Sequence, residues 1–372
     1  MQSAVSWRLA TSISVTLAVL AAVATAAPAA ATTRPPARPS AAARPSAGLA
    51  WHRLTLLHGW TSAQSSYETG NPSWAAKGGI VYLSGSVRQV SEAGGSFARL
   101  PSGARPAHIQ YFAVYTVNYA YGQLVVDPDG LMYVITFPES EAEGYTSLAG
   151  ISFPASGTAA HKLALRSGWR PAPAADDGGA PAYSLAGGVV HLSGEASQPS
   201  GTGLLLGVLP KGARPAEVVY LTVLTDELAP GTVRIATNGD VYAYGGNARN
   251  VTSLDGLSFR PGKTGWHTLT LLNGWASRQV QYHTGFPEYQ VSGGVVYLSG
   301  AVGNPAASSD TFARLPKGAR PAHYLYIDAY TVGGYVGTLY IEPDGDISVS
   351  GPNVADGQVL TSLTGISFPL GS

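Results

Sequence analysis

The chain carries three copies of one pattern of roughly a hundred residues, and this repeat constrains the fold more than any other feature. Each copy begins with an alternating apolar segment that ends in Gly-Trp, at Trp60, Trp169 and Trp275. Each then shows Gly-Ile/Val-Val-x-Leu-Ser-Gly and closes on Gly-Ile/Leu-Ser-Phe. A period of this length predicts a whole domain per copy, because solenoid units span only a few tens of residues.

Within a copy the apolar residues alternate with a period of two, as in a half-buried β-strand. In the first copy Val81 and Leu83 fall on one face, whereas Tyr82 and Ser84 fall on the other. Asp-Gly or Asn-Gly turns near Gly130, Gly239 and Gly345 predict hairpins. About eight short strands per copy are expected. The fold class is therefore all-β, with three tandem β-sandwich or jelly-roll-like domains.

The start of the chain is typical of an export signal. Arg8 precedes an apolar run from Thr11 to Ala24, followed by small residues suited to cleavage. The run is shorter than the roughly 20 residues of a spanning helix, so we expect a secreted protein without a membrane span in its mature form. The predicted parts are a signal peptide (1–31), a Pro/Ala-rich linker (32–50), and the β-sandwich repeats one (51–154), two (160–261) and three (266–369).

Composition and motifs argue against several classes of function. The chain has 22 basic and 22 acidic residues, and this balance gives no attraction for nucleic acid. It has no cysteine, hence no disulfide or thiolate ligand. The 8 histidines lack metal-ligand spacing, and no hydrolase or phosphate-loop motif is complete. We therefore expect no metal, no cofactor and no catalysis.

The motif Leu-Pro-x-Gly-Ala-Arg-Pro recurs at Leu100–Pro106, Leu209–Pro215 and Leu315–Pro321. Together with the Gly-Trp, the Gly-Val-Val strand, the Gly-ended turn and the closing strand, it resembles the C-terminal head domains of phage tail fibres and related receptor-binding tail proteins. This resemblance implies a small jelly-roll-like sandwich, usually a homotrimer, that recognises cell-surface glycans.

Three copies in one chain raise two possible arrangements. The copies could pack around a pseudo-threefold axis as an intramolecular pseudo-trimer, or stand apart as monomeric beads. The connectors at 155–160 and 261–265 reach roughly 20 Å when extended, which permits either.

Aromatic residues that differ between copies are the candidate ligand-binding residues, because flat rings on loops suit stacking on sugars. The alternative is that they cover neighbouring copies. The candidates are Tyr67, Trp74, Tyr119, Tyr121, Tyr282, Tyr289 and Tyr335.

Three other recurring features have a structural interpretation. For Trp60, Trp169 and Trp275 we expect packing in the core or at its rim. For Arg105 and its two counterparts we expect hydrogen bonds that fix a loop. For the turn aspartates we expect hydrogen bonds to the backbone and not acid–base chemistry.

The sequence thus predicts a secreted, non-catalytic recognition protein that binds cell-surface or extracellular carbohydrate through loop aromatics. A structural or adhesive cell-envelope protein is the first alternative, and a glycan-cleaving enzyme the second.

Overall fold

The computed structural model describes residues 48–91, 95–136, 139–173, 177–304, 306, 309–351 and 354–372. By its contacts, the chain from Pro45 to Ser372 forms one unit. The predicted signal peptide and most of the predicted linker lie outside the described residues, so the fold concerns the three repeats.

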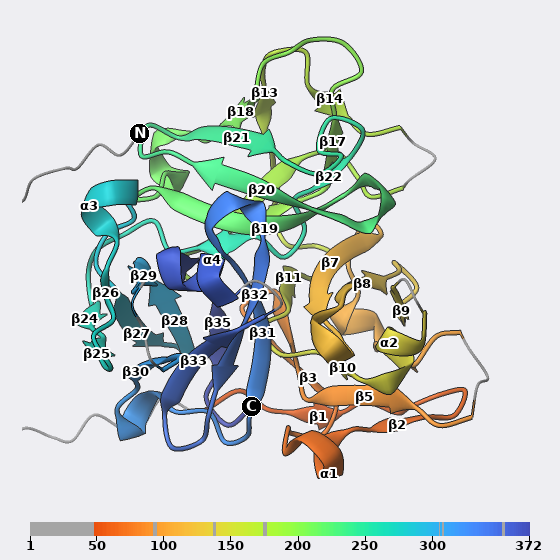
Figure 1. Ribbon diagram of the computed structural model, residues 1–372. Helices are drawn as coiled ribbons and strands as arrows, with labels where there is room; N and C mark the ends of the chain where they lie inside the picture. The colour runs from red at the N-terminus through yellow and green to blue at the C-terminus, as the bar shows by residue number, and fades with distance from the viewer. Residues whose placement is uncertain are drawn as a thin grey trace, which may run out of the picture. The chain divides into compact units, whose positions relative to one another are not determined.

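The described chain is all-β, as the period-two pattern predicts, with antiparallel strand pairing throughout the described sheets (Figure 1). Repeat one contains β1 (His52–Arg53), β2 (Trp60–Ser62), β3 (Ser73–Lys77), β4 (Ile80–Ser84), β5 (Ser86–Gln89), β6 (Ala98–Arg99), β7 (Gln110–Tyr115), β8 (Tyr121–Val126), β9 (Leu131–Ile135), β10 (Thr146–Ser147) and β11 (Ser152–Pro154).

Repeat two contains β12 (His161–Lys162), β13 (Ala164–Leu165), β14 (Arg170–Pro171), β15 (Ala182–Ala186), β16 (Val189–Ser193), β17 (Glu195–Ser197), β18 (Leu205–Val208), β19 (Val219–Thr225), β20 (Ala229–Ile235), β21 (Asp240–Tyr244), β22 (Thr252–Ser253) and β23 (Ser258–Phe259).

Repeat three contains β24 (His267–Thr268), β25 (Thr270–Leu271), β26 (Ala276–Ser277), β27 (Glu288–Ser292), β28 (Val295–Ser299), β29 (Ala301–Gly303), β30 (Thr311–Arg314), β31 (Leu325–Tyr330), β32 (Val336–Ile341), β33 (Asp346–Ser350), β34 (Thr361–Ser362) and β35 (Ser367–Pro369).

Short helical turns connect the strands. They are α1 (Gln64–Tyr67), α2 (Glu139–Gly144), α3 (Gln279–Tyr282), α4 (Val354–Val359), η1 (Ser102–Ala104), η2 (Val117–Tyr119), η4 (Lys211–Ala213), η5 (Asp226–Leu228), η6 (Lys317–Ala319) and η7 (Val332–Gly334). There are more strands per repeat than the expected eight, because two-residue strands are too short to show alternation.

The repeats share one sheet topology. The first sheet runs β1-β3-β4-β11 in repeat one, and its counterparts run β12-β15-β16-β23 and β24-β27-β28-β35. The second sheet contains a three-stranded meander, β7-β8-β9 in repeat one. In repeat two this sheet continues into β22, β17 and β14. In repeats one and three the equivalent strands form separate sheets, β10-β5-β2 and β34-β29-β26. A single bridge joins each of these to the meander sheet, Thr116–Thr146 in repeat one and Thr331–Thr361 in repeat three.

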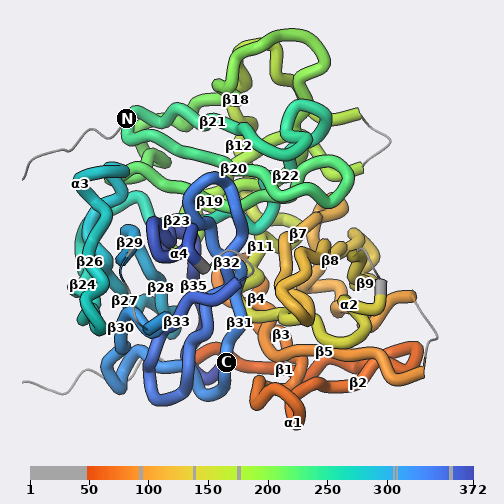
Figure 2. The backbone as a smooth tube through the Cα atoms, viewed as in Figure 1, coloured from red at the N-terminus to blue at the C-terminus, as the bar shows by residue number. Residues whose placement is uncertain are grey.

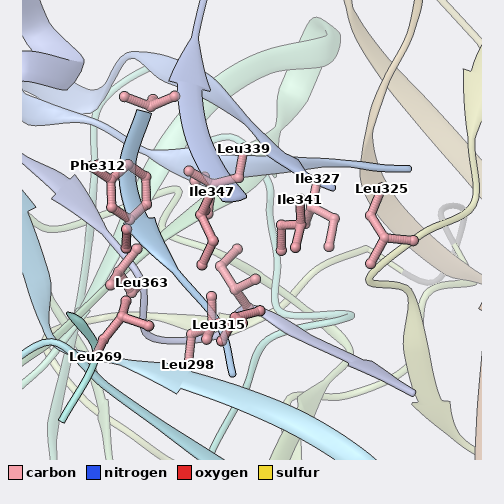
Figure 3. Close-up of a cluster of buried hydrophobic side chains, with 14 of the residues drawn as sticks. Leu269, Leu298, Phe312, Leu315, Leu325, Ile327, Leu339, Ile341, Ile347 and Leu363 are labelled. Carbon is pink, nitrogen blue, oxygen red and sulfur yellow. The ribbon is translucent and has the colours of Figure 1, made fainter. Parts of the chain in front are cut away.

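Each repeat has its own buried apolar cluster, formed almost wholly by that repeat. In repeat three, Leu298, Phe312, Leu339 and Ile347 come from four strands and meet in this core (Figure 3). These side chains come from both sheets of the repeat and are buried between them. The arrangement is therefore sandwich-like, and the hydrophobic effect stabilises it.

The recurring tryptophans belong to these cores, as predicted. Trp60, Trp169 and Trp275 are each no more than 6% exposed. The ring of Trp60 lies 5.8 Å from that of Phe97, and Trp275 lies 5.5 Å from Phe312. These rings fill the sandwich and are not accessible to a ligand.

The recurring arginines fix a loop, as predicted. The Nε atoms of Arg105, Arg214 and Arg320 donate to the carbonyl oxygens of the motif leucines, at 3.0, 3.1 and 2.9 Å. Each bond joins the arginine near the end of the motif to the leucine at its beginning, so the arginine has a structural role.

The turn aspartates also act as predicted. Asp129 Oδ1 accepts from the backbone N–H of Leu131 at 2.9 Å, and Asp344 Oδ1 accepts from that of Asp346 at 3.0 Å. Asn238 takes the same role in repeat two. Turn formation accounts for these side chains.

The three repeats contact one another through equivalent strands. β7, β19 and β31 each contact the other two, near the middle of the view (Figure 2). A further cluster, the axial cluster, joins Ile80 and Tyr82 of repeat one with Val189 of repeat two and Tyr297 of repeat three. Leu49 is buried in it, although the sequence places this residue in the linker. The repeats are thus packed together and do not stand apart as beads.

The contacts follow a cyclic order, from repeat one to three, three to two, and two to one. A side chain at Gly150 would meet Ile327, one at Gly256 would meet Phe112, and one at Gly365 would meet Leu221. Glycine allows this close approach at all three boundaries. Each repeat therefore uses one surface to contact a different surface of the next, which closes a ring.

Hydrogen bonds repeat this order. Ser147 Oγ donates to the carbonyl of Tyr326 at 2.7 Å, and the equivalent Ser253 Oγ donates to that of Tyr111 at 3.0 Å. At the boundary between repeats two and one, the buried Asp255 carboxylate also accepts from the N–H groups of Tyr111 (3.0 Å) and Gly194 (2.9 Å). Asp255 therefore links repeat two to repeat one.

Burial of Asp255 predicts a pH-dependent stability. Desolvation raises its pKa from 3.8 to about 7, although the N–H groups of Gly194 and Tyr111 act in the opposite direction. The folded state keeps this proton up to about pH 7 and the unfolded state loses it near pH 4, so stability falls as pH rises through this window. Asp255→Thr, which places the residue of repeat three (Thr364) in repeat two, should reduce this fall by on the order of 2–4 kcal/mol.

Urea unfolding between pH 4 and pH 8 measures how steeply the free energy of unfolding of each protein falls with pH. Asp255→Asn, which has no ionisable carboxyl but keeps an acceptor oxygen, is the matched control and should behave like Asp255→Thr. Parallel pH profiles for parent and variants would contradict the role of Asp255.

Candidate functional site

Two of the predicted binding residues lie between repeats. Tyr67 of repeat one is half-buried, with its ring 4.1 Å from that of Tyr145 and 6.4 Å, edge-on, from Tyr326 of repeat three. Tyr282 occupies the equivalent position of repeat three and lies edge-on to Tyr220 of repeat two, at 6.4 Å. This placement favours the alternative interpretation, in which the rings cover a neighbouring repeat.

Tyr119 and Tyr121 also lie at the boundary between repeats one and three. Tyr119 is 39% exposed, but its hydroxyl is hydrogen-bonded to Ser350 at 2.9 Å and accepts from Tyr340 at 3.3 Å. Tyr121 begins β8, and its hydroxyl is buried with no hydrogen-bond partner among the described residues. Burial raises the pKa of Tyr121, and the nearby Asp328 raises it further.

Trp74 and Tyr289 were expected on loops, but they lie in strands β3 and β27. They are equivalent residues, each paired across the sheet with the histidine that opens its repeat. The ring of Trp74 stacks on that of His52 at 4.8 Å, and Tyr289 lies 5.4 Å from His267. Both pack partly against their own core, because alternation turns one face of the strand inward.

Tyr335 follows η7 and is 49% exposed. The seven predicted residues therefore do not converge on one surface. A ligand-binding role for them stays a prediction, and most of their ring area is engaged in packing within or between repeats.

A different constellation forms a groove of about 160 Å³ between repeats two and three. Phe286 lines it and is 56% exposed. Trp266 also lines it, half-buried, with its indole N–H donating to the carbonyl of Gly262 at 2.9 Å. Charged side chains complete the lining: Glu217, Arg260, Lys263 and Glu288.

The charges in the groove interact with one another. Lys263 forms an ion pair with Glu217, and both side chains are substantially exposed. Burial raises the pKa of Glu288, Lys263 lowers it and Glu217 raises it, so these three groups are close in space. An exposed ion pair stabilises a fold by at most about 1 kcal/mol, so this pair contributes little to folding.

The residues that line this groove differ from those at the equivalent positions of the other repeats. Phe286 corresponds to Asn71 in repeat one and to Ala180 in repeat two. Glu217, which meets the Phe286 loop, corresponds to His108 and His323. Aligning the three repeats shows that Phe286 and Glu217 each differ from their equivalents. Only the packing of repeat three on repeat two brings these two residues together.

No group of three His, Asp or Glu side chains is placed to hold a metal ion in the part of the chain that the structure describes. None of the helices described there has the length and apolar character needed to cross a membrane.

Alanine at the boundary tyrosines should destabilise the protein. Tyr67→Ala and Tyr282→Ala each remove a ring packed between repeats, and we expect a loss of about 1–3 kcal/mol. Tyr335→Ala is the control, because this ring is half exposed, and it should change stability by less than about 0.5 kcal/mol. Chemical denaturation measures all three; equal midpoints for Tyr67→Ala and Tyr335→Ala would show that the boundary contacts contribute little.

Comparison with known proteins assigns no family to the chain. No family model matches it, and a search of curated proteins gives no match in sequence. The resemblance to tail-fibre head domains therefore stays a prediction.

Proposed function

We propose that this chain is a secreted carbohydrate-recognition protein and that the groove between repeats two and three binds the ligand. One observation carries the proposal: an exposed Phe286 and a half-buried Trp266 share a groove with Glu217, Lys263 and Glu288. The proposal keeps the ligand class expected from the sequence and changes the residues that bind it.

The chemistry of the groove suits a sugar. Sugars offer apolar ring faces and hydroxyl edges, which match aromatic rings and charged hydrogen-bonding groups respectively. Lys263 supplies N–H donors, whereas Glu217 and Glu288 supply acceptors. An aromatic ring that stays 56% exposed gains free energy when a ligand covers it, at about 25 cal/mol per Å² of apolar surface.

A structural role is the second candidate, because tyrosines of neighbouring repeats stack at their boundaries. Tyr115 stacks on Tyr326 at 5.7 Å, and Tyr330 stacks on Tyr220 at 5.5 Å. A chain whose aromatic residues serve only this packing would need no small ligand.

Cleavage of a glycan is favoured by one observation, the presence of Glu217 and Glu288 in one groove. Glycosidases use two carboxylates, one of them with a raised pKa. Glu217 is engaged with Lys263, however, and this pairing suits ligand binding better than water activation.

A glycan-array screen of the chain from Thr32, with Phe286→Ala and Trp266→Ala, tests the proposal. These variants place the residues of repeat two, Ala180 and Ala160, in repeat three. We expect the parent to bind and each variant to bind at least about tenfold more weakly, which corresponds to ~1.4 kcal/mol of lost contact. Val280→Ala, at an 82% exposed apolar residue outside the groove, should bind as the parent does.

Three outcomes would change the proposal. Binding that survives in both groove variants would place the site elsewhere. Binding to no glycan or cell-wall polymer would leave the structural role. Release of sugar fragments from a bound glycan, lost in Glu288→Gln, would indicate an enzyme.

A further inference from the structure

A second cavity lies where the three repeats meet. Its volume is about 90 Å³, well above the roughly 10–15 Å³ that one water molecule needs. Equivalent residues of β7, β19 and β31 line it, among them Ala113, Thr222 and Asp328. The cavity is therefore built by the ring of repeats and not by any single repeat.

The equivalent positions differ in chemistry. Repeat one has a methyl group, repeat two a hydroxyl and repeat three a carboxyl. Asp328 and Thr222 are only half-buried as residues, because their side chains border the cavity. Yet Asp328 Oδ2 and Thr222 Oγ1 are buried atoms without a hydrogen-bond partner among the described residues. Leaving a buried carboxylate oxygen unpaired is costly, and a partner in the cavity would offset this cost.

The surroundings of Asp328 supply no positive charge. The described residues that line the cavity include no lysine, arginine or histidine. The other carboxylate there, Asp255, already accepts two backbone N–H groups. Burial raises the pKa of the Asp328 carboxyl to about 8. The remaining titratable groups nearby are the tyrosines Tyr115, Tyr121, Tyr220, Tyr326 and Tyr330.

We propose that this cavity binds a monovalent metal cation, Na⁺ or K⁺, with the Asp328 carboxylate as the charged ligand and the Thr222 hydroxyl as a neutral one. One negative charge matches one positive charge, and oxygen ligands suit hard cations. A divalent ion would leave a net charge in a buried site, and Ca²⁺ takes six to eight oxygen ligands, more than these side chains offer. Water molecules in the remaining volume would complete the coordination.

The test is thermal unfolding in NaCl, KCl and choline chloride at equal ionic strength. Choline carries the same charge but is too large for the site. At pH 9, Na⁺ or K⁺ should raise the parent's Tm by on the order of 2–4 °C over choline, because a cation that binds only the folded state stabilises it.

Two variants decide whether Asp328 is the ligand. Asp328→Thr introduces the residue of repeat two and should abolish the difference between the salts. Thr222→Ala introduces that of repeat one and should reduce it. Equal Tm values for the parent in all three salts at pH 9 would overturn the proposal, as would a difference that persists unchanged in Asp328→Thr. Glycan binding by the groove that Phe286 lines is a separate readout, so either proposal can fail alone.

Discussion

The packing of β7, β19 and β31 against one another is the contact on which the rest of the arrangement depends. Each strand turns one face to its own core and the other to its neighbours, because side chains alternate along a strand. In repeat three, Ile327 belongs to the core, and it also lines the cavity where the three repeats meet, together with Tyr326 and Asp328. A single strand thereby couples the stability of its repeat to the assembly of all three.

The boundaries obey the same geometry but differ in composition. A tyrosine pair stacks at two of them, Tyr115 on Tyr326 and Tyr330 on Tyr220. At the third boundary Leu224 takes the place of one tyrosine, and the buried Asp255 supplies hydrogen bonds across it. An aromatic stack and a buried carboxylate thus serve one purpose, and the carboxylate makes its boundary sensitive to pH.

These differences between repeats also locate the candidate sites. Residues shared by all three, such as the motif arginines and the Gly-Trp tryptophans, are engaged in structure. Residues peculiar to one repeat, such as Phe286 and Asp328, are exposed in a groove or unpaired in a cavity. A repeated scaffold must keep the positions that fold it, so positions that vary between its copies are free to acquire a ligand.

The sequence by itself determined the all-β class, the recurrence of one pattern, the hairpin turns and the packing roles of the tryptophans and arginines. These follow from local alternation, turn chemistry and self-comparison, which need no knowledge of distant contacts. Only the tertiary structure decided that Tyr67 and Tyr282 face a neighbouring repeat, that Trp74 lies in a strand, and that Glu217 meets Phe286. These relations join residues far apart in the chain, and their geometry depends on how one repeat packs on the next, which no local pattern encodes.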